Sequence, residues 1–406
     1  MNITVKTRTL LESLKLAAAV IDKKAAPVLQ NVKLAVGKKE AFLFAADTKC
    51  SLRLPLDCRI HRAGVVVLPL QDLRIVLKAT KVKNLMIYAR NGKLFVCEDT
   101  EDSIHVKHFP LTPPAQPDTF PDVLPFKEKM YYEFPPQKIE EALQRVLFAA
   151  EKPPKAGSIS IRPLLTGICL EAAKKIGTID LIAVDGFKLA WQSLQGLAVG
   201  KPGLPEQSVI PQKPLRILEK MLKEIGRGSP VKAAVLPPKK KNQPGSVCFS
   251  IEGAVIGSAL MHECSKFPLC RKLAEVGKET PYLQIFPAEI LPLLDQLSVL
   301  AKLEKKENLI LDVDKGILRL SLAGNNGFTL KANGPKNFKE RVQVHLENFY
   351  AGWKAVQNLS EPLQLYFYSE TNPPGTSPKR NIRIVFKTLE QTGYVYVLLG
   401  EEPEAV

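Results

Sequence analysis

The segment LPLQDLRIVL, Leu68 to Leu77, is nearly repeated further along the chain as IPQKPLRILE, Ile210 to Glu219. Both segments carry Pro, Leu-Arg and Ile in the same register, and the Pro stands near the start of a helical pattern, where its missing N–H is not needed. A third segment, HLENFYAGWKAV (His345 to Val356), keeps only the pattern, with Tyr350 and Trp353 in apolar positions. A spacing of about 140 residues indicates an internal repeat, which determines the fold.

Each of these segments is preceded by an earlier helical pattern. Apolar residues recur at helical spacing, so that Leu10, Ile139 and Ile290 are equivalent positions. We expect these first helices over Val5 to Ala19, Phe134 to Ala149 and Ile285 to Ala301.

Apolar runs with turn residues fill the intervals between the helices. The runs between the two helices of each copy are Glu40 to Leu52, Gly177 to Ala190 and Gly316 to Ala332, and the closing strand pairs are Gly92 to Phe109, Gly245 to His262 and Arg380 to Gly400. The short polar or Gly-bearing centres of these runs are hairpin signals. Asp47 and Asp185 occupy equivalent places, which indicates a turn-forming role.

The repeat predicts an α+β chain of three domains, each with two helices packed on antiparallel sheets. The expected domains are residues 1–127, 128–278 and 279–406, with boundaries in the Pro-rich stretch Pro110 to Pro125 and near Gly277 to Pro281. About 135 residues per copy is a normal size for a domain with its own core.

Composition indicates a globular, cytoplasmic protein. Hydrophobic residues make up 45% of the 406, and no run approaches the roughly 20 apolar residues of a membrane helix. The N-terminus MNITVKTRTLL lacks the basic start and apolar core of a signal peptide. The 7 cysteines are scattered and odd in number, which fits reduced thiols.

The net charge of +16 favours a polyanionic partner, and nucleic acid is the first candidate. The alternative is a solubilising charge spread over the surface. Distribution favours the first interpretation, because Arg216, Lys220 and Lys223 share one helix face while Leu215 and Leu218 share another. The residues expected to face the nucleic acid are Lys15, Lys23, Lys24, Arg74, Lys78, Arg145, Lys152, Arg216, Lys220 and Lys223.

Catalytic motifs are missing from the sequence. It contains no GxxxxGK[ST] loop, HExxH helix or GxSxG elbow. His262, Cys264 and Cys270 match no common zinc spacing. Asp312 and Asp314 could be paired carboxylates on a strand, although a hairpin turn at Asp-Lys-Gly is the favoured interpretation. We therefore expect a protein that is not an enzyme and has no cofactor and no metal.

The chain resembles the bacterial DNA polymerase III beta subunit, the sliding clamp, over its whole length. The resemblance lies in the repeat order and in segments that follow one another in the right order: MNITVKTRTLLESL at the start, APVLQNVKL (Ala26 to Leu34), AVDGFKLA (Ala183 to Ala190), VIPQKPLRILEKML (Val209 to Leu222) and KFPLCRKL (Lys266 to Leu273).

This resemblance implies a ring made by a head-to-tail homodimer, with helices lining the hole and sheets forming the outer wall. The cationic helix faces would then attract phosphates without reading bases, so that the ring slides on duplex DNA. The implied function is that of a replication processivity factor that tethers the replicative DNA polymerase. The other implied partners are a clamp loader and repair polymerases or ligase.

The family also binds partner peptides in a hydrophobic cleft between its second and third domains. By matching positions, the resemblance places Leu165, Gly186, Phe187, Lys188, Leu189, Pro268, Lys272, Leu273, Val397, Leu398 and Leu399 in that cleft. The end of the chain, Val397 to Val406, and the segment Glu263 to Cys270 depart from the family pattern, and Pro163 and Leu164 replace a tyrosine pair.

Two alternatives follow from these departures and from the carboxylates. One is a basic DNA-binding scaffold of the same fold with altered or lost partner docking. The other is a metal-dependent nuclease that uses Asp312 and Asp314. The insertion KKKNQPG, Lys239 to Gly245, is expected to form an exposed basic loop.

Overall fold

The structure is a computed structural model that describes most of the chain. The described residues are 1–22, 26–80, 82–90, 93–98, 108–111, 116–121, 126, 130–154, 160–173, 177–200, 207–225, 228–236, 243–268, 270–322, 327–370, 381–388 and 393–403. Lys23, Lys24 and most of the Lys239 to Gly245 insertion lie outside these residues.

The expected helix pairs are confirmed in all three copies. The α-helices are α1 (Thr7–Val20), α2 (Leu70–Ala79), α3 (Pro136–Val146), α4 (Gln212–Glu224), α5 (Pro287–Glu304) and α6 (Leu346–Lys354). The apolar spacing places Leu10, Leu14 and Ala17 of α1 in the core. Ile290, Leu294 and Leu297 of α5 are buried in the same way. A pattern with helical period thus buries one face of each helix.

The described strands form three sheets, and every strand pair whose register is described is antiparallel. The first sheet has the order β5 (Cys58–Arg62), β1 (Asn2–Lys6), β7 (Asn84–Arg90), β8 (Lys93–Glu98) and β9 (His108–Leu111). The second has the order β14 (Leu197–Val199), β10 (Tyr131–Phe134), β16 (Val231–Leu236), β17 (Ser246–Ile251), β18 (Ala254–Ala259), β4 (Cys50–Pro55), β3 (Ala41–Ala46), β2 (Val32–Val36) and β6 (Gly64–Leu68).

The third sheet has the order β15 (Ser208–Pro211), β11 (Gly167–Ala172), β12 (Thr178–Val184), β13 (Lys188–Gln195), β26 (Tyr394–Glu401), β23 (Lys339–His345), β20 (Asn308–Asp314), β21 (Ile317–Leu322) and β22 (Gly327–Lys331). From β26 it branches through β25 (Asn381–Lys387) and β24 (Leu363–Glu370) to β19 (Tyr282–Ile285).

The chain divides into two compact units. Unit 1 comprises residues 1–140, 196–204 and 210–262, and unit 2 comprises residues 141–195, 205–209 and 263–406. The expected second domain contributes strands to both, because β18 pairs with β4 of the first copy and β13 pairs with β26 of the third. The division into residues 1–127, 128–278 and 279–406 stays a prediction.

Asp47 and Asp185, which occupy equivalent places in the first two copies, each close a turn. Asp47 Oδ1 accepts hydrogen bonds from the backbone N–H groups of Lys49 and Cys50, at 2.8 and 2.6 Å. Asp185 Oδ1 accepts them from Phe187 and Lys188, at 2.9 and 3.0 Å. The carboxylate therefore closes the same turn in both copies, as expected from sequence.

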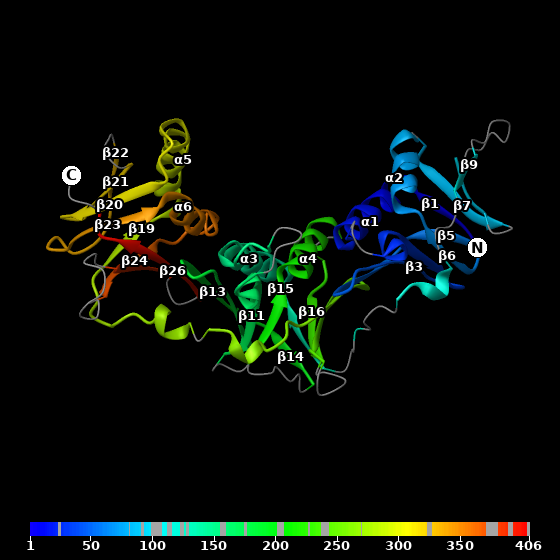
Figure 1. Cartoon of the computed structure of the whole chain (residues 1–406), viewed down its shortest axis with the longest axis horizontal. Helices are drawn as coiled ribbons and strands as arrows, with labels where there is room; N and C mark the ends of the chain where they lie inside the picture. Colours follow the sequence, from blue (N-terminus) through cyan, green and yellow to red (C-terminus); the bar gives the residue numbers. More distant parts are fainter. Residues whose placement is uncertain are drawn as a thin grey trace. The chain divides into compact units, whose positions relative to one another are not determined.

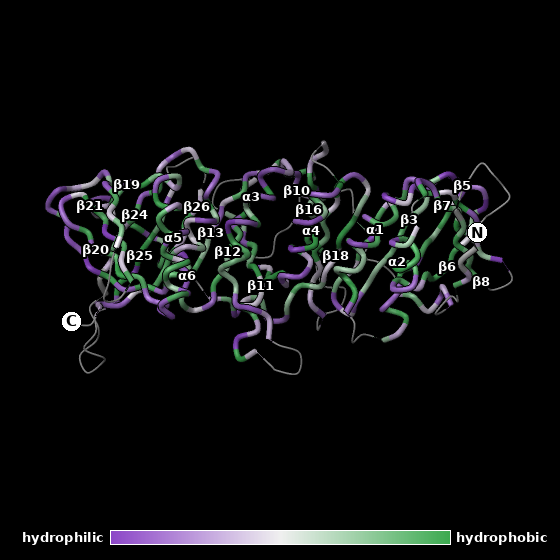
Figure 2. The backbone as a smooth tube through the Cα atoms, turned by 90° about the horizontal axis from the view of Figure 1, so that it is seen from above, coloured by the Kyte–Doolittle hydropathy of each residue, from purple (hydrophilic) through white to green (hydrophobic). Residues whose placement is uncertain are grey.

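Aromatic side chains fasten α6 to the strands of unit 2. Trp353 and Phe349 are fully buried against Phe386, at ring-centroid distances of 5.6 and 5.5 Å. At Gly352 an added Cβ would lie 2.4 Å from the ring of Tyr396, so only glycine allows this approach. Figure 1 shows α5 and α6 together beside β20 and β23. In Figure 2, hydrophobic segments run through the packed elements and hydrophilic ones mark many turns.

Candidate functional site

The exposed face of α4 presents the cations expected from sequence. Arg216, Lys220 and Lys223 are exposed, whereas Leu215 and Leu218 are buried. Arg216 donates to Gln212 Oε1 at 2.8 Å, and Lys223 pairs with Glu219 at 3.1 Å. The pairings lie along the helix and leave both cations exposed at the surface, so the face can attract phosphates.

The first copy supplies further cations to unit 1. Lys15 on α1 and Lys78 on α2 are exposed, and Arg74 is half-buried. Helices α1 and α4 pack against each other, as Figure 1 also shows. Lys15 and the α4 cations therefore belong to neighbouring helices of one unit, whereas Lys152 is an exposed residue of unit 2.

Arg145 does not present its charge to solvent, contrary to the sequence-based expectation. Its side chain is 8% exposed, donates to Gln192 Oε1 at 3.0 Å and lies 3.5 Å from Glu141 Oε2. Burial lowers the pKa of the guanidinium, and Glu141 opposes this effect. The helix pattern placed Arg145 with the cations, but the residue is packed against β13 and serves the fold.

Ten of the eleven residues assigned to the peptide cleft fall into two groups, and the remaining one, Lys188, is half-buried. Leu165, Leu189, Val397 and Leu398 are at most 6% exposed, so their side chains lie in the core, and their place in a peptide cleft stays a prediction. Gly186, Phe187, Pro268, Lys272, Leu273 and Leu399 are exposed, and we call these six the Phe187 surface. The side chains of Phe187, Leu273 and Leu399 are 65%, 40% and 45% exposed, which is unusual for large apolar residues.

The sheet brings the parts of the Phe187 surface together. The Leu399 N–H donates to the Phe187 carbonyl at 3.0 Å, next to the pairing of Leu189 with Val397. Arg383 on β25 lies opposite Leu399 on β26, and its guanidinium donates to the carbonyl of Leu273 at 3.1 Å. Three segments far apart in the chain thus present apolar side chains at one place in unit 2.

Charged groups border this surface, and one of them was not identified from sequence. The Arg162 guanidinium donates to the Asp185 carbonyl at 3.1 Å and lies 3.7 Å from Glu151. An added Cβ at Gly186 would lie 2.5 Å from Arg162 Nη1, and Gly186 has a φ of +96°, so glycine is required there. No sequence motif indicates Arg162, because Asp185 and Gly186 lie in a later turn, between β12 and β13. The Lys188 ammonium is paired with Asp185.

Several of the groups considered for catalysis or metal binding lie at a turn or make ion pairs and hydrogen bonds. Lys315 and Gly316 have φ values of 52° and 76°, which confirms the hairpin turn after Asp314. Asp314 lies 3.4 Å from Lys339 Nζ. The Cys264 sulfur accepts the Val209 N–H at 3.2 Å, and burial raises the pKa of Cys270 to about 11. Within the described ranges, no three His, Cys, Asp or Glu residues are placed to hold a metal ion.

The three sheets with paired helices constitute the fold of bacterial sliding clamps. The DNA polymerase III subunit beta of Pseudomonas aeruginosa matches with a TM-score of 0.76 at 18% identity, covering 99% of this chain and 100% of that chain. The sliding clamp of Bacillus subtilis matches with a TM-score of 0.76 at 15% identity, covering 98% of both chains. The Bartonella birtlesii sliding clamp, solved bound to griselimycin, matches with a TM-score of 0.76 at 19% identity, covering 98% of this chain and 99% of that one.

Residues 1–113 match the family model of the DNA polymerase III beta subunit, N-terminal domain. The chain is therefore similar to this family in sequence over residues 1–113, and it shares the sliding-clamp fold over its whole length. A search of curated proteins found no match. No helix in the described part of the chain is both long and apolar enough to cross a membrane.

Proposed function

We propose that the chain is a DNA sliding clamp that closes into a ring as a head-to-tail homodimer and tethers a replicative polymerase to duplex DNA. The ring would encircle DNA in the cytoplasm, after a clamp loader opens it. Cationic faces such as that of α4 would hold phosphates without base contacts, so the protein could slide. The exposed apolar side chains of the Phe187 surface would bind short segments of the polymerase, of repair polymerases or of ligase.

The observation that carries this proposal is a junction that occurs twice within the chain. In the first junction, β4 pairs with β18, the closing strand of the next copy, from Cys50 opposite Ser258 to Arg53 opposite Val255. In the second, β13 pairs with the next closing strand, β26. The same hairpin strand therefore meets the same closing strand both times.

Among the described strands, one of each kind has no such partner. β22 is the third hairpin strand and ends the path of its sheet, and β9 is the first closing strand and ends the five-stranded sheet. An unpaired edge is a template for another strand. A second copy of the chain would place its β9 on β22, and its β22 on β9 of the first copy, which closes a two-fold ring.

Exposed apolar side chains on the neighbouring helices agree with this arrangement. In unit 1, α1 packs against α4, where Ile217 is 2% exposed. Its equivalent in the first copy, Ile75 of α2, is 67% exposed. On α5, the equivalent of α1, Val299 and Leu303 are 59% and 75% exposed. The apolar residues that a third junction would cover are therefore present on both of its sides.

The test is topological. The purified protein is loaded on a nicked circular plasmid, with the host's clamp loader if needed, and separated from free protein by gel filtration at 0.15 M salt or more. We expect the protein to stay with the circle and to dissociate when one restriction cut linearises the DNA. Equal loss from circular and linear DNA would refute encirclement.

A further inference from the structure

The part of the Phe187 surface after β18 has little regular structure of its own. Lys272 and Leu273 belong to a single 3₁₀ turn, Arg271–Ala274, closed by the Leu273 N–H donating to the Cys270 carbonyl at 3.0 Å. A turn this short cannot fix its own position. The contacts of the turn with the neighbouring strands must therefore determine where Leu273 lies.

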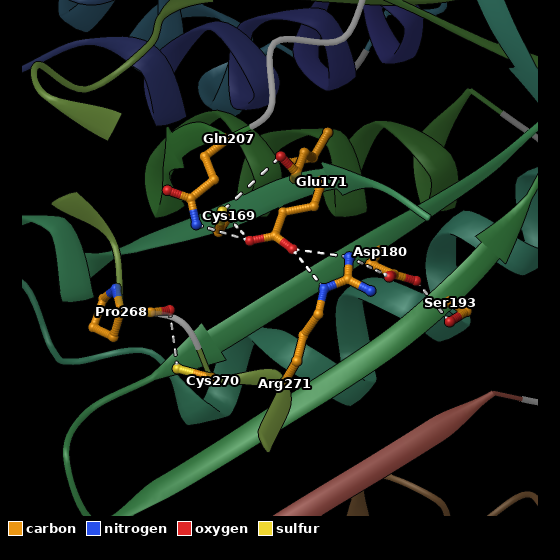
Figure 3. A network of polar contacts seen from close by, with 9 residues as sticks. Cys169, Glu171, Asp180, Ser193, Gln207, Pro268, Cys270 and Arg271 are labelled. Carbon is orange, nitrogen blue, oxygen red and sulfur yellow. Dashed lines mark hydrogen bonds and ion pairs between the residues drawn. The ribbon is translucent and has the colours of Figure 1, made fainter. Parts of the chain in front are cut away.

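Arg271 ties this turn to the strands of the second copy. Its Nε and Nη2 donate to Glu171 Oε2 at 3.1 and 2.9 Å, and Nη2 lies 3.1 Å from Asp180 Oδ2. The guanidinium also lies over the Trp191 ring, 5.2 Å from its centroid. Figure 3 shows the Arg271 side chain reaching from its turn to both carboxylates on β11 and β12.

Each of the two carboxylates also has a hydrogen-bond partner other than Arg271. The side chain of Asp180 is 1% exposed and that of Glu171 is 10% exposed. The Ser193 hydroxyl donates to Asp180 Oδ1 at 2.7 Å, and the Gln207 amide donates to Glu171 Oε1 at 2.9 Å. Asp180 is thus oriented by Ser193 of β13 and Glu171 by Gln207, just before β15, so the two carboxylates form a hydrogen-bonded receptor for one planar cation.

An arginine of the third copy also contacts this turn. Arg383 Nη1 donates to the carbonyls of Lys272 and Leu273, at 3.4 and 3.1 Å. The Arg383 guanidinium itself lies 4.9 Å from the centroid of the Tyr368 ring. The turn is therefore fixed between two arginine contacts, of which only that of Arg271 involves paired buried charges.

We propose that Arg271 is the positioning residue of the Phe187 surface: by binding Glu171 and Asp180 it holds Lys272 and Leu273 where a partner peptide meets them. Arg271 directs its guanidinium into the protein and acts through its neighbours rather than by touching the peptide. The inference rests on the proposed docking function of that surface. A lysine would not replace it, because a single ammonium cannot present the fork that engages two carboxylates and a ring face together.

The experiment uses the full-length protein with griselimycin as the probe, since a related clamp is solved bound to it. The variants are Arg271→Met, the triple variant Glu171→Gln/Asp180→Asn/Arg271→Met, and Arg8→Met as a control on a side chain that is 90% exposed. The readouts are the griselimycin Kd by calorimetry, amide hydrogen exchange of residues 271–275, and the midpoint of thermal unfolding.

We expect Arg271→Met to lower the unfolding midpoint, because it leaves two buried carboxylates without their cation. The triple variant should recover much of that midpoint, since it carries no such charges. Both should still exchange the amides of residues 271–275 faster and raise the Kd about tenfold, because binding must then order the turn. Arg8→Met should match the wild type in all three readouts.

Loss of stability alone cannot produce this result, because the triple variant recovers the unfolding midpoint without the Arg271 contacts that position the turn. Wild-type exchange and wild-type Kd in the triple variant would overturn the inference. If the wild type itself does not bind griselimycin, that result counts against docking at the Phe187 surface, which is a part of the proposed function. The exchange of residues 271–275 then decides by itself whether Arg271 positions the turn.

Discussion

Leu303→Asp should separate the proposed ring into single chains. Leu303 lies near the end of α5 and is 75% exposed in the protomer, and the repeat places it at the third junction. Full burial of a leucine side chain contributes about 2 kcal/mol, so burying its exposed part contributes roughly 1.5 kcal/mol at each junction. A two-fold ring contains the junction twice, which gives roughly 3 kcal/mol for the dimer.

This loss corresponds to at least about a hundredfold increase in the dimer dissociation constant. The cost of moving two carboxylates out of water adds to it. Sedimentation velocity over a dilution series measures the constant, and thermal unfolding of the diluted protein checks the fold. Because Leu303 is exposed in the protomer, the variant protomer should unfold at the same temperature as a wild-type protomer.

The matched control is Ile161→Asp, which makes the same kind of change at a side chain that is 97% exposed and belongs to no junction strand or helix. This control should dimerise like the wild type. Ile75→Asp, on the other side of the junction, should weaken the dimer as Leu303→Asp does. A wild-type dimer that Leu303→Asp and Ile75→Asp leave intact would refute the proposed junction.

Three further predictions concern stability, DNA binding and pH. Lys213→Met should lower the free energy of unfolding, measured by urea titration, by about 1 to 3 kcal/mol, because Asp47 Oδ2 loses the ammonium that lies 2.6 Å away. Lys339→Met removes the cation of an exposed pair, and an equal effect of this change would contradict the reasoning. Lys220→Met should reduce the slope of log K against log salt by about 0.9 for each DNA phosphate that the ammonium neutralises, measured by fluorescence anisotropy on duplex DNA, and an unchanged slope would remove α4 from the DNA face. Burial raises the pKa of Cys248 to about 12, so above pH 9 the thiol loses its proton in the unfolded chain but keeps it in the folded protein. The free energy of unfolding should therefore fall by about 1.4 kcal/mol per pH unit because of this group. If a Cys248→Ala variant shows the same dependence of the free energy of unfolding on pH as the wild type, another group is responsible.

The local pattern of the sequence predicts much of the fold. The period of apolar residues located all six helices of the described structure, and the turns at Asp47 and Asp185 are closed as their residue types require. These features depend on residues within a few positions of one another, and such short-range preferences are visible in a single sequence.

The sequence was less informative about individual site residues. Of the cleft positions, Phe187, Leu273 and Leu399 are exposed as a docking role requires, but Leu165 and Leu189 are buried. Arg162 was missed, because the residues that it contacts, Asp185 and Gly186, lie in a later turn between β12 and β13. Whether an apolar residue is exposed depends on what packs over it, and side-chain type does not reveal this.

The order of residues along the chain is enough to establish three copies of one unit, the helices and turns of each copy, and an excess of positive charge. The folded structure was needed to show that β4 and β13 each pair with the next copy's closing strand, that Arg145 is internal, and that Arg271 meets Glu171 and Asp180. The physical reason is that strand pairing and buried ion pairs join segments distant in sequence. Strands pair through backbone N–H and C=O groups, which are the same in every residue type and so leave no signal in the sequence. A charged side chain is buried only where a partner of opposite charge or a hydrogen bond stabilises it, and that partner can lie anywhere along the chain.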